Sequence, residues 1–93
     1  MVFGITMIKV EPGREDSAYL AIQSIKGVKE IHKVFGEYSL FLIMDAYGQM
    51  DLDGIVDEIR LAGDVVEVLP VLVGAKSKPT NLTISEREEP AYT

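Results

Sequence analysis

The sequence predicts one small α+β domain with the element order βαββαβ, and three observations predict it. Two apolar segments have the length and composition of buried strands, and each is followed by a segment with apolar residues at helical spacing. Each helical segment ends near a Gly-Val or Gly-Asp-Val sequence that opens a further, less apolar strand. With 93 residues, of which 47% are hydrophobic and 26% charged, the chain has the size and composition of one globular domain.

The first strand and helix are predicted from residues 2–27. Residues 2–10 are apolar except for Gly4, Thr6 and Lys9, which is typical of a buried strand. After the break at Pro12-Gly13, acidic residues at positions 15 and 16 suit a helix N-terminus. The apolar residues at helical spacing are Ala18, Ala21, Ile22 and Ile25. We expect Gly27 to end this helix in a left-handed cap.

The next two strands are predicted to form a hairpin. Residues 28–35 mix apolar and charged side chains, as an edge strand does. Residues 36–38 form a tight turn, and residues 39–46 include five consecutive apolar residues, which is typical of a strand buried on both faces.

The second helix and the last strand are predicted from residues 49–73. Asp51 is expected to cap the helix and Gly63 to end it. Its apolar face comprises Leu52, Ile55, Val56 and Ile59. Residues 65–73 form the fourth strand, and Pro70 places this strand at a sheet edge because proline cannot donate a backbone hydrogen bond.

These assignments predict a ferredoxin-like βαββαβ fold with a four-stranded antiparallel sheet. Such a fold places the first and third strands, here the most apolar, in the centre. Right-handed crossovers put both helices on one face, so large apolar side chains emerge on the other face. A patch of this kind is larger than monomers usually expose, and a second sheet about 10 Å away would cover it. We therefore expect a face-to-face homodimer of the dimeric α+β barrel type.

Charge and composition exclude several classes of function. A net charge of −6 argues against direct binding of nucleic acid, and the absence of cysteine excludes disulfides and thiolate ligands. No segment has the roughly 20 apolar residues that span a bilayer, and the N-terminus lacks the features of a secretory signal. We expect a cytoplasmic protein without a membrane contact.

We expect the chain to divide into a domain of residues 1–74 and a polar tail of residues 75–93. Within the tail, Leu82 and Ile84 alternate with polar residues as in a short added strand. A neighbouring subunit is one surface on which this tail can dock.

Three stretches resemble the effector-binding (RAM) domain of the Lrp/AsnC transcriptional regulators. They are residues 5–15 (ITMIKVEPGRE), residues 28–42 (VKEIHKVFGEYSLFL) and residues 63–73 (GDVVEVLPVLV). The second is the most specific, because a strand ending in Val-x-Gly-x-Tyr passes directly into another strand. The resemblance covers residues 2–74 and identifies the chain as a stand-alone member that lacks the helix-turn-helix of full-length relatives.

The resemblance implies a function as well as a fold. Such domains dimerise through their sheets, often assemble into rings of dimers, and bind amino acids or related small molecules between dimers. A stand-alone member would act on transcription indirectly, for example by mixed assembly with a DNA-binding relative. No cofactor is implied.

The resemblance also implies a ligand site formed by the hairpin turn and the last strand. Its expected residues are Gly36, Glu37, Tyr38, Ser39, Val68 and Pro70. The family turn usually continues Gly-x-Tyr-Asp, whereas this chain has Ser39, so Glu37 is the carboxylate that can meet a ligand's ammonium group. The family's last strand often carries Thr-x-Thr, where this chain has Val68 and Pro70.

Other chemistry has weaker support. His32, the only histidine, could act as a general base, but no nucleophile or metal ligand stands at a telling spacing, so we expect no catalytic residue. The acidic residues around the second helix match no metal-binding loop, so we expect no metal site. The alternatives are a small dimeric α+β barrel enzyme, of monooxygenase or isomerase type, with an internal cavity lined by His32 or Tyr19, and an ACT-like regulatory module with side-by-side sheets.

Overall fold

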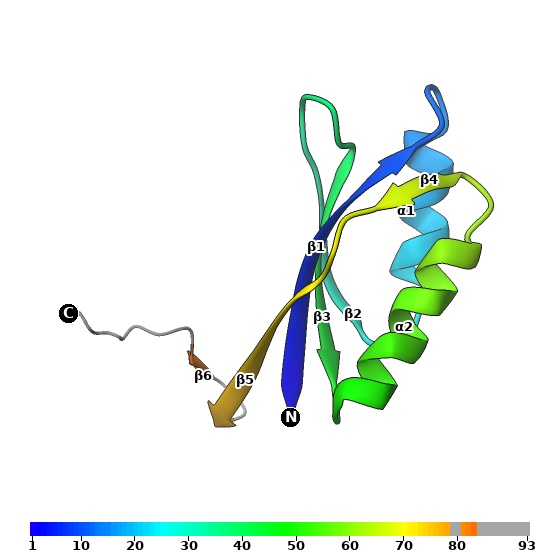
Figure 1. Cartoon of the computed structure of the whole chain (residues 1–93). Coiled ribbons are helices and arrows are strands. Elements are labelled where there is room, and N and C mark those ends of the chain that lie inside the picture. The colour runs from blue at the N-terminus through cyan, green and yellow to red at the C-terminus, as the bar shows by residue number, and fades with distance from the viewer. Residues whose placement is uncertain (79–80, 84–93) are drawn as a thin grey trace.

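The computed structural model describes residues 1–78 and 81–83 (Figure 1). Its elements are β1 (Val2–Val10), α1 (Glu15–Gln23), β2 (Val28–Lys33), β3 (Leu40–Ala46), α2 (Gln49–Leu61), β4 (Val65–Val68), β5 (Leu72–Lys78) and β6 (Asn81–Thr83). The first six follow the order βαββαβ, so the predicted α+β class and ferredoxin-like fold are confirmed.

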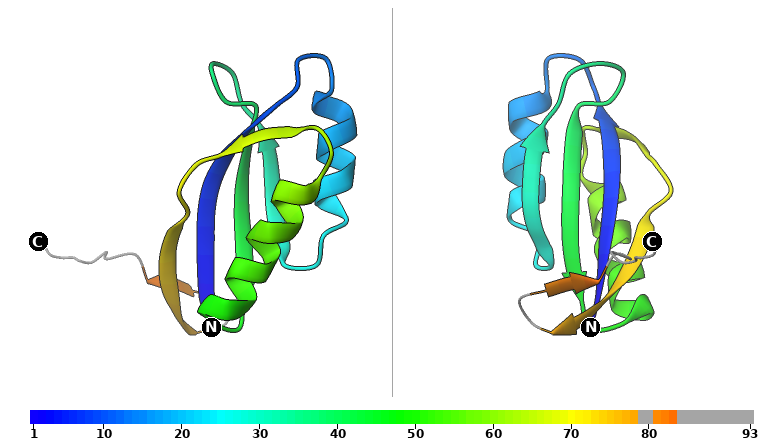
Figure 2. Two further views of the ribbon diagram at one scale, coloured as in Figure 1. Left: turned by 45° about the vertical axis from the view of Figure 1, so that its right-hand side comes forward. Right: turned by 90° about the vertical axis from the view of Figure 1, so that its left-hand side faces the viewer.

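The sheet is antiparallel, with β3 and β1 in its centre. β2 pairs with β3 at one edge, and β4 and β5 both pair with the free side of β1. Both helices cover the same face of the sheet (Figure 2). The predicted strand order and helix placement are therefore confirmed, and the opposite side is called the open face below.

The fourth strand, predicted as one segment of residues 65–73, is interrupted. β4 pairs with the end of β1 around Ile8, β5 pairs with its beginning, and Pro70 lies in the break between them. The break is held by Leu69, whose backbone N–H donates to the Met7 carbonyl at 3.0 Å and whose carbonyl accepts from the Thr6 hydroxyl at 2.8 Å. Because Pro70 has no N–H to donate, the chain leaves β1 there and returns at Leu72.

The end of the described chain adds a hairpin to the sheet. β5 continues beyond residue 74 to Lys78 and pairs with β6. The added strand predicted around Leu82 is therefore present, and it pairs with the same chain. Ile84 and the proposed docking of the rest of the tail lie outside the described residues.

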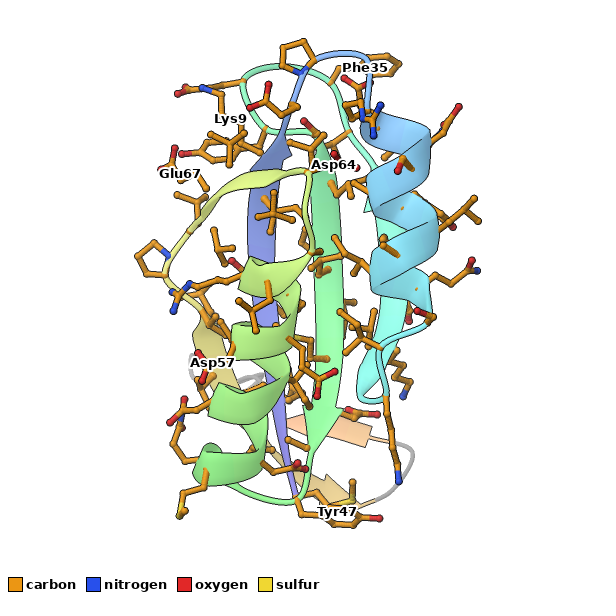
Figure 3. All side chains as sticks on the ribbon, turned by 90° about the vertical axis from the view of Figure 1, so that its right-hand side faces the viewer. Lys9, Phe35, Tyr47, Asp57, Asp64 and Glu67 are labelled. Atoms are coloured by element: carbon orange, nitrogen blue, oxygen red, sulfur yellow. The ribbon has the colours of Figure 1, made fainter. Side chains whose placement is uncertain are left out.

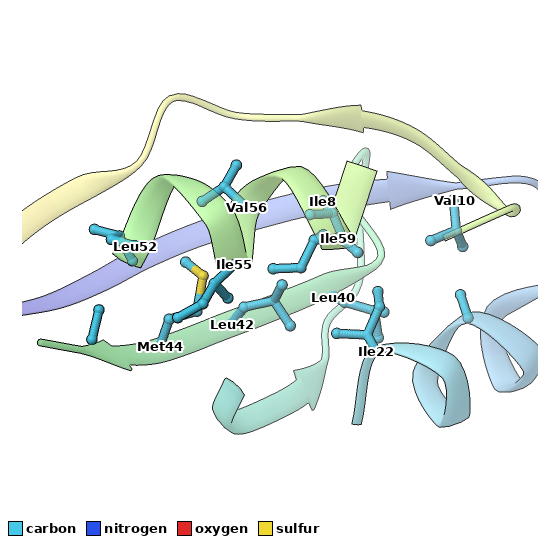
Figure 4. Close-up of a cluster of buried hydrophobic side chains, with 12 residues drawn as sticks. Ile8, Val10, Ile22, Leu40, Leu42, Met44, Leu52, Ile55, Val56 and Ile59 are labelled. Atoms are coloured by element: carbon cyan, nitrogen blue, oxygen red, sulfur yellow. The ribbon is translucent and has the colours of Figure 1, made fainter. Parts of the chain in front are cut away.

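The core lies between the sheet and the two helices (Figure 4). Its largest fully buried side chains are Ile8, Ile22, Leu40, Leu42, Met44, Leu52 and Ile59. All four residues predicted for the apolar face of α2 are buried. In α1, Ala18 and Ile22 are buried as predicted, but Ala21 is exposed. Burying each large aliphatic side chain contributes about 1.5–3 kcal/mol, so this cluster is the main source of stability.

The predicted caps of the helices are only partly right. α1 ends at Gln23, with Ser24 rather than Gly27 at its C-cap, and α2 ends at Leu61, followed by an extended Ala62. Neither predicted glycine is therefore a helix cap. The N-cap of α2 is Gly48, while the Asp51 carboxylate accepts a hydrogen bond from the Tyr47 backbone N–H at 2.9 Å.

The open face carries the apolar side chains that the sequence predicted. Alternate residues of β1 and β3 point there, and their register pairs Ile5 with Ile43 and Met7 with Phe41. These residues, together with Leu72, which pairs with Ile5, are called the open-face stripe: Ile5, Met7, Phe41, Ile43 and Leu72. β3 was expected to be buried on both faces; here the core side is fully buried, while Phe41 and Ile43 are half-buried.

Phe3 lies on the open face but is only 2% exposed. It faces Gly74 of β5, where an added Cβ would lie 2.3 Å from the Phe3 ring. A glycine at position 74 therefore allows β5 to pass close to this ring. Within residues 1–78 and 81–83, no helix combines the length and apolar character needed to cross a membrane.

Candidate functional site

The turn between β2 and β3 is anchored to the end of β1. The Ser39 backbone N–H donates to the Ile8 carbonyl at 2.8 Å, and the Val10 N–H donates to the Ser39 hydroxyl at 3.4 Å. Gly36 adopts a φ of +111°, a conformation that costs glycine little and other residues more. The four predicted turn residues thus form a shaped loop rather than a loose connection.

Two side chains of the turn reach residues that lie far away in the sequence. The Glu37 carboxylate lies 4.0 Å from the Lys9 ammonium group, and the Tyr38 hydroxyl donates to the Glu67 carboxylate at 3.3 Å. Lys9 and Glu67 are direct partners across the β1–β4 ladder. We call Lys9, Glu37, Tyr38 and Glu67 the hairpin-end cluster; Figure 3 shows Lys9 and Glu67 near one end of the sheet and Tyr47 at the other.

The electrostatics of this cluster follow from two carboxylates and one ammonium group. Desolvation raises the pKa of Tyr38 above its ordinary value, and the negative charge of Glu67 raises this pKa further. The side chains of Lys9 and Glu37 are 41% and 70% exposed, so their ion pair is weak and exchangeable. The cluster can therefore rearrange around a charged group without a large loss of stability.

The two site residues predicted from the last strand, Val68 and Pro70, lie in different surroundings. Val68 pairs with Ile8, directly across β1 from Leu40, and its side chain packs against the core. Pro70 is exposed and lies beyond the end of β4. The structure thus brings the turn and β4 to the same end of β1, where Glu67 of β4 accepts the hydrogen bond from Tyr38.

An open hollow of about 320 Å³ lies beside the turn. It is lined by Glu15, Lys33, Val34, Phe35, Gly36, Tyr38 and Ser39. Lys33 forms an ion pair with Asp16 of α1, which lowers the pKa of Asp16 and raises the pKa of Lys33 through their hydrogen bond and opposite charges. Phe35 is fully exposed at the tip of the turn.

The two other candidate residues, His32 and Arg14, each lie beside a carboxylate. His32 lies on the open face, with its Nε2 atom 3.1 Å from the Glu30 carboxylate. Arg14, after the first turn, pairs with Asp64 at 3.3 Å. In the part of the chain that the structure describes, no three acidic or histidine side chains are close enough together to hold a metal ion.

The internal cavity that would favour a barrel-type enzyme is not found among the described residues. Tyr19 and His32 do line one hollow, of about 270 Å³, but it is open and lies at β2, on the sheet edge. The buried core lies between the helices and the sheet, and an open hollow of about 480 Å³ between α2 and residues 71–73 is lined by neither Tyr19 nor His32.

Comparison with known proteins shows similarity at the level of structure. No family model matches the sequence, and no curated protein matches it. A hypothetical protein from Pyrococcus horikoshii superposes with a TM-score of 0.73 at 23% identity, over 82% of this chain and 92% of the other. A protein from Thermus thermophilus has a TM-score of 0.73 at 21% identity, over 85% of this chain and 99% of the other.

A third solved structure is AsnC from E. coli, with a TM-score of 0.71 at 20% identity. The match covers 89% of this chain and 56% of AsnC. At these identities the likeness concerns the fold. The chain therefore has the fold that its resemblance to the Lrp/AsnC effector-binding domain implied, and it shares this fold with E. coli AsnC.

Proposed function

We propose that the chain is a small-molecule effector-binding and assembly domain related to the Lrp/AsnC regulators, and that it acts on transcription indirectly and without catalysis. The observation that carries this proposal is the hairpin-end cluster, in which the turn meets β4 through the hydrogen bond between Tyr38 and Glu67. The fold shared with AsnC supports it. Such a role is exercised in the cytoplasm, where we expect the protein.

The cluster suits an amino-acid-like ligand. The carboxylates of Glu37 and Glu67 can accept hydrogen bonds from a ligand's ammonium group, and the Lys9 ammonium group can donate to its carboxylate. The exposed backbone at Gly36 leaves room for close approach. In this proposal Ser39 shapes the turn, Val68 supports the site from the core side of β4, and Pro70 lies exposed beyond the end of β4.

Assembly in this proposal uses the open face. The open-face stripe lacks a covering layer of helices, and a second copy of the chain offers an equally apolar sheet to cover it. The resulting homodimer could assemble further into a ring of dimers or mix with a DNA-binding relative. A ligand that contacts two subunits favours the assembly that forms its site, which couples binding to oligomeric state.

The test is light scattering and thermal unfolding of the whole chain with a panel of amino acids. We expect one compound to raise the melting temperature and to shift the mass, and E37Q and E67Q to lower its affinity about tenfold each, as expected for a hydrogen bond to a charged group. E58Q is the matched control. It removes one negative charge, as E37Q and E67Q do, but Glu58 is exposed on α2, away from the cluster. A protein that responds to none of the compounds, or variants that respond as the wild type does, would contradict the proposed effector site.

A further inference from the structure

We propose that Glu30 and His32 make the association of two chains depend on pH, so that two copies associate more tightly as the pH falls. This inference rests on the face-to-face assembly proposed above. It concerns a pair of side chains beside the open-face stripe, and it gives the only histidine of the chain a role.

Both side chains lie on the surface that a second copy would cover. In the β2–β3 ladder, Glu30 pairs with Ile43 and His32 pairs with Phe41, two members of the stripe. The rings of His32 and Phe41 have their centroids 6.3 Å apart. The Glu30 carboxylate lies 3.1 Å from His32 Nε2, and the side chains of Glu30 and His32 are 48% and 58% exposed in the single chain.

The charged groups around the pair have partners of their own. Lys29 lies 3.5 Å from Asp45 of β3. Tyr19 of α1 lines the same edge hollow as His32, and Lys33, the next residue of β2, pairs with Asp16. Glu30 and His32 can therefore be treated as one unit whose charge changes with pH.

The direction of the effect follows from the cost of covering a charge. When His32 is neutral, the pair carries the negative charge of Glu30. Covering the pair with a second sheet then removes water from a carboxylate that forms no ion pair with a lysine or arginine of residues 1–78 and 81–83. When His32 is protonated, the pair is neutral overall and is covered at a lower cost. Association is therefore linked to the uptake of a proton by the pair, and it strengthens as the pH falls.

The experiment measures the dissociation constant of the assembly by sedimentation equilibrium at about pH 8 and about pH 5.5. Each copy carries a net charge of −6, so a lower pH reduces the repulsion between copies and strengthens their association whether or not His32 is present. The H32Q variant keeps this effect but lacks the imidazole. We expect the dissociation constant of the wild type to fall about tenfold further than that of H32Q between the two values. We expect E30Q to associate more tightly than the wild type at the higher pH and to gain less than the wild type on going to the lower pH.

The outcomes separate this inference from the assembly on which it rests. A wild type that associates with the same pH dependence as H32Q overturns the role of the pair and leaves the assembly intact. A wild type that remains a single protomer at both values overturns the face-to-face assembly and this inference with it. Proton uptake on association, measured by calorimetry in buffers of different ionisation enthalpy, gives a second readout that does not depend on the variants.

Discussion

At the scale of single residues, close packing as well as backbone conformation determines which amino acid a position can hold. Gly27 has a φ of +103°, and a Cβ there would lie 2.3 Å from Ile55 Cδ1 and 2.8 Å from Ile55 Cγ1. Ile55 is buried in α2, so it cannot move aside easily. Gly27 is thus required where the connection from α1 to β2 passes under α2.

Replacing this glycine tests that conclusion. We expect G27A to lower the free energy of unfolding by about 2–4 kcal/mol, because it combines backbone strain with overpacking. G63A is the matched control, since Gly63 lacks a positive φ and its Cβ would meet nothing within 4 Å. Urea unfolding of both variants measures the difference, and equal losses in the two would show that the contact with Ile55 is unimportant.

At the scale of elements, α2 owes its position to one apolar face rather than to strong helix formers along its whole length. Leu52, Ile55, Val56 and Ile59 recur at helical spacing and are all buried, whereas Gly54 lies between them on the exposed side. A glycine inside a helix costs stability because the unfolded chain has more conformations to lose. The burial of the apolar face offsets this cost.

We therefore expect G54A to stabilise the protein. A Cβ at position 54 would meet nothing within 4 Å, so the gain should approach the difference in helix propensity, about 1 kcal/mol. Thermal and urea unfolding measure it, with G63A again as a glycine-to-alanine change outside the helix. A loss of stability in G54A would mean that this side of α2 is covered in solution.

At the scale of the whole molecule, the fold has one covered face and one uncovered face. Both helices pack on the core side, which holds the largest fully buried side chains among the described residues. The opposite side has charged residues around the open-face stripe, among them Lys9, Glu30 and Glu67. An apolar centre with a polar rim is the usual anatomy of a surface that meets another protein.

A charge placed in the stripe should separate the copies. We expect I43E to be a folded monomer by light scattering and circular dichroism, because association would bury a carboxylate without a partner. L61E is the matched control: Leu61 is 83% exposed at the end of α2, on the helix side, so this variant should associate like the wild type. A dimeric I43E would show that the open face is not the surface of contact.

The sequence by itself determined the elements whose signals are local. The limits of β1, the buried face of α2 and the order of the strands follow from apolar periodicity and from proline and glycine positions, which act within a few residues. The turn at Gly36 was predictable for the same reason. Local signals predicted only the turn itself, and the resemblance carried by residues 28–42 named Glu37 and Tyr38 as site residues.

Only the tertiary structure decided which distant residues meet. Lys9 joins the turn because its partly exposed side chain lies near the end of β1, and Glu67 joins because β4 pairs with that end, in a register set by contacts between segments far apart in the sequence. The close approach of Ile55 to Gly27 likewise depends on how α2 packs on the connection between α1 and β2. Periodicity records which side of an element is buried, but strand register and close approach arise only when the elements pack together.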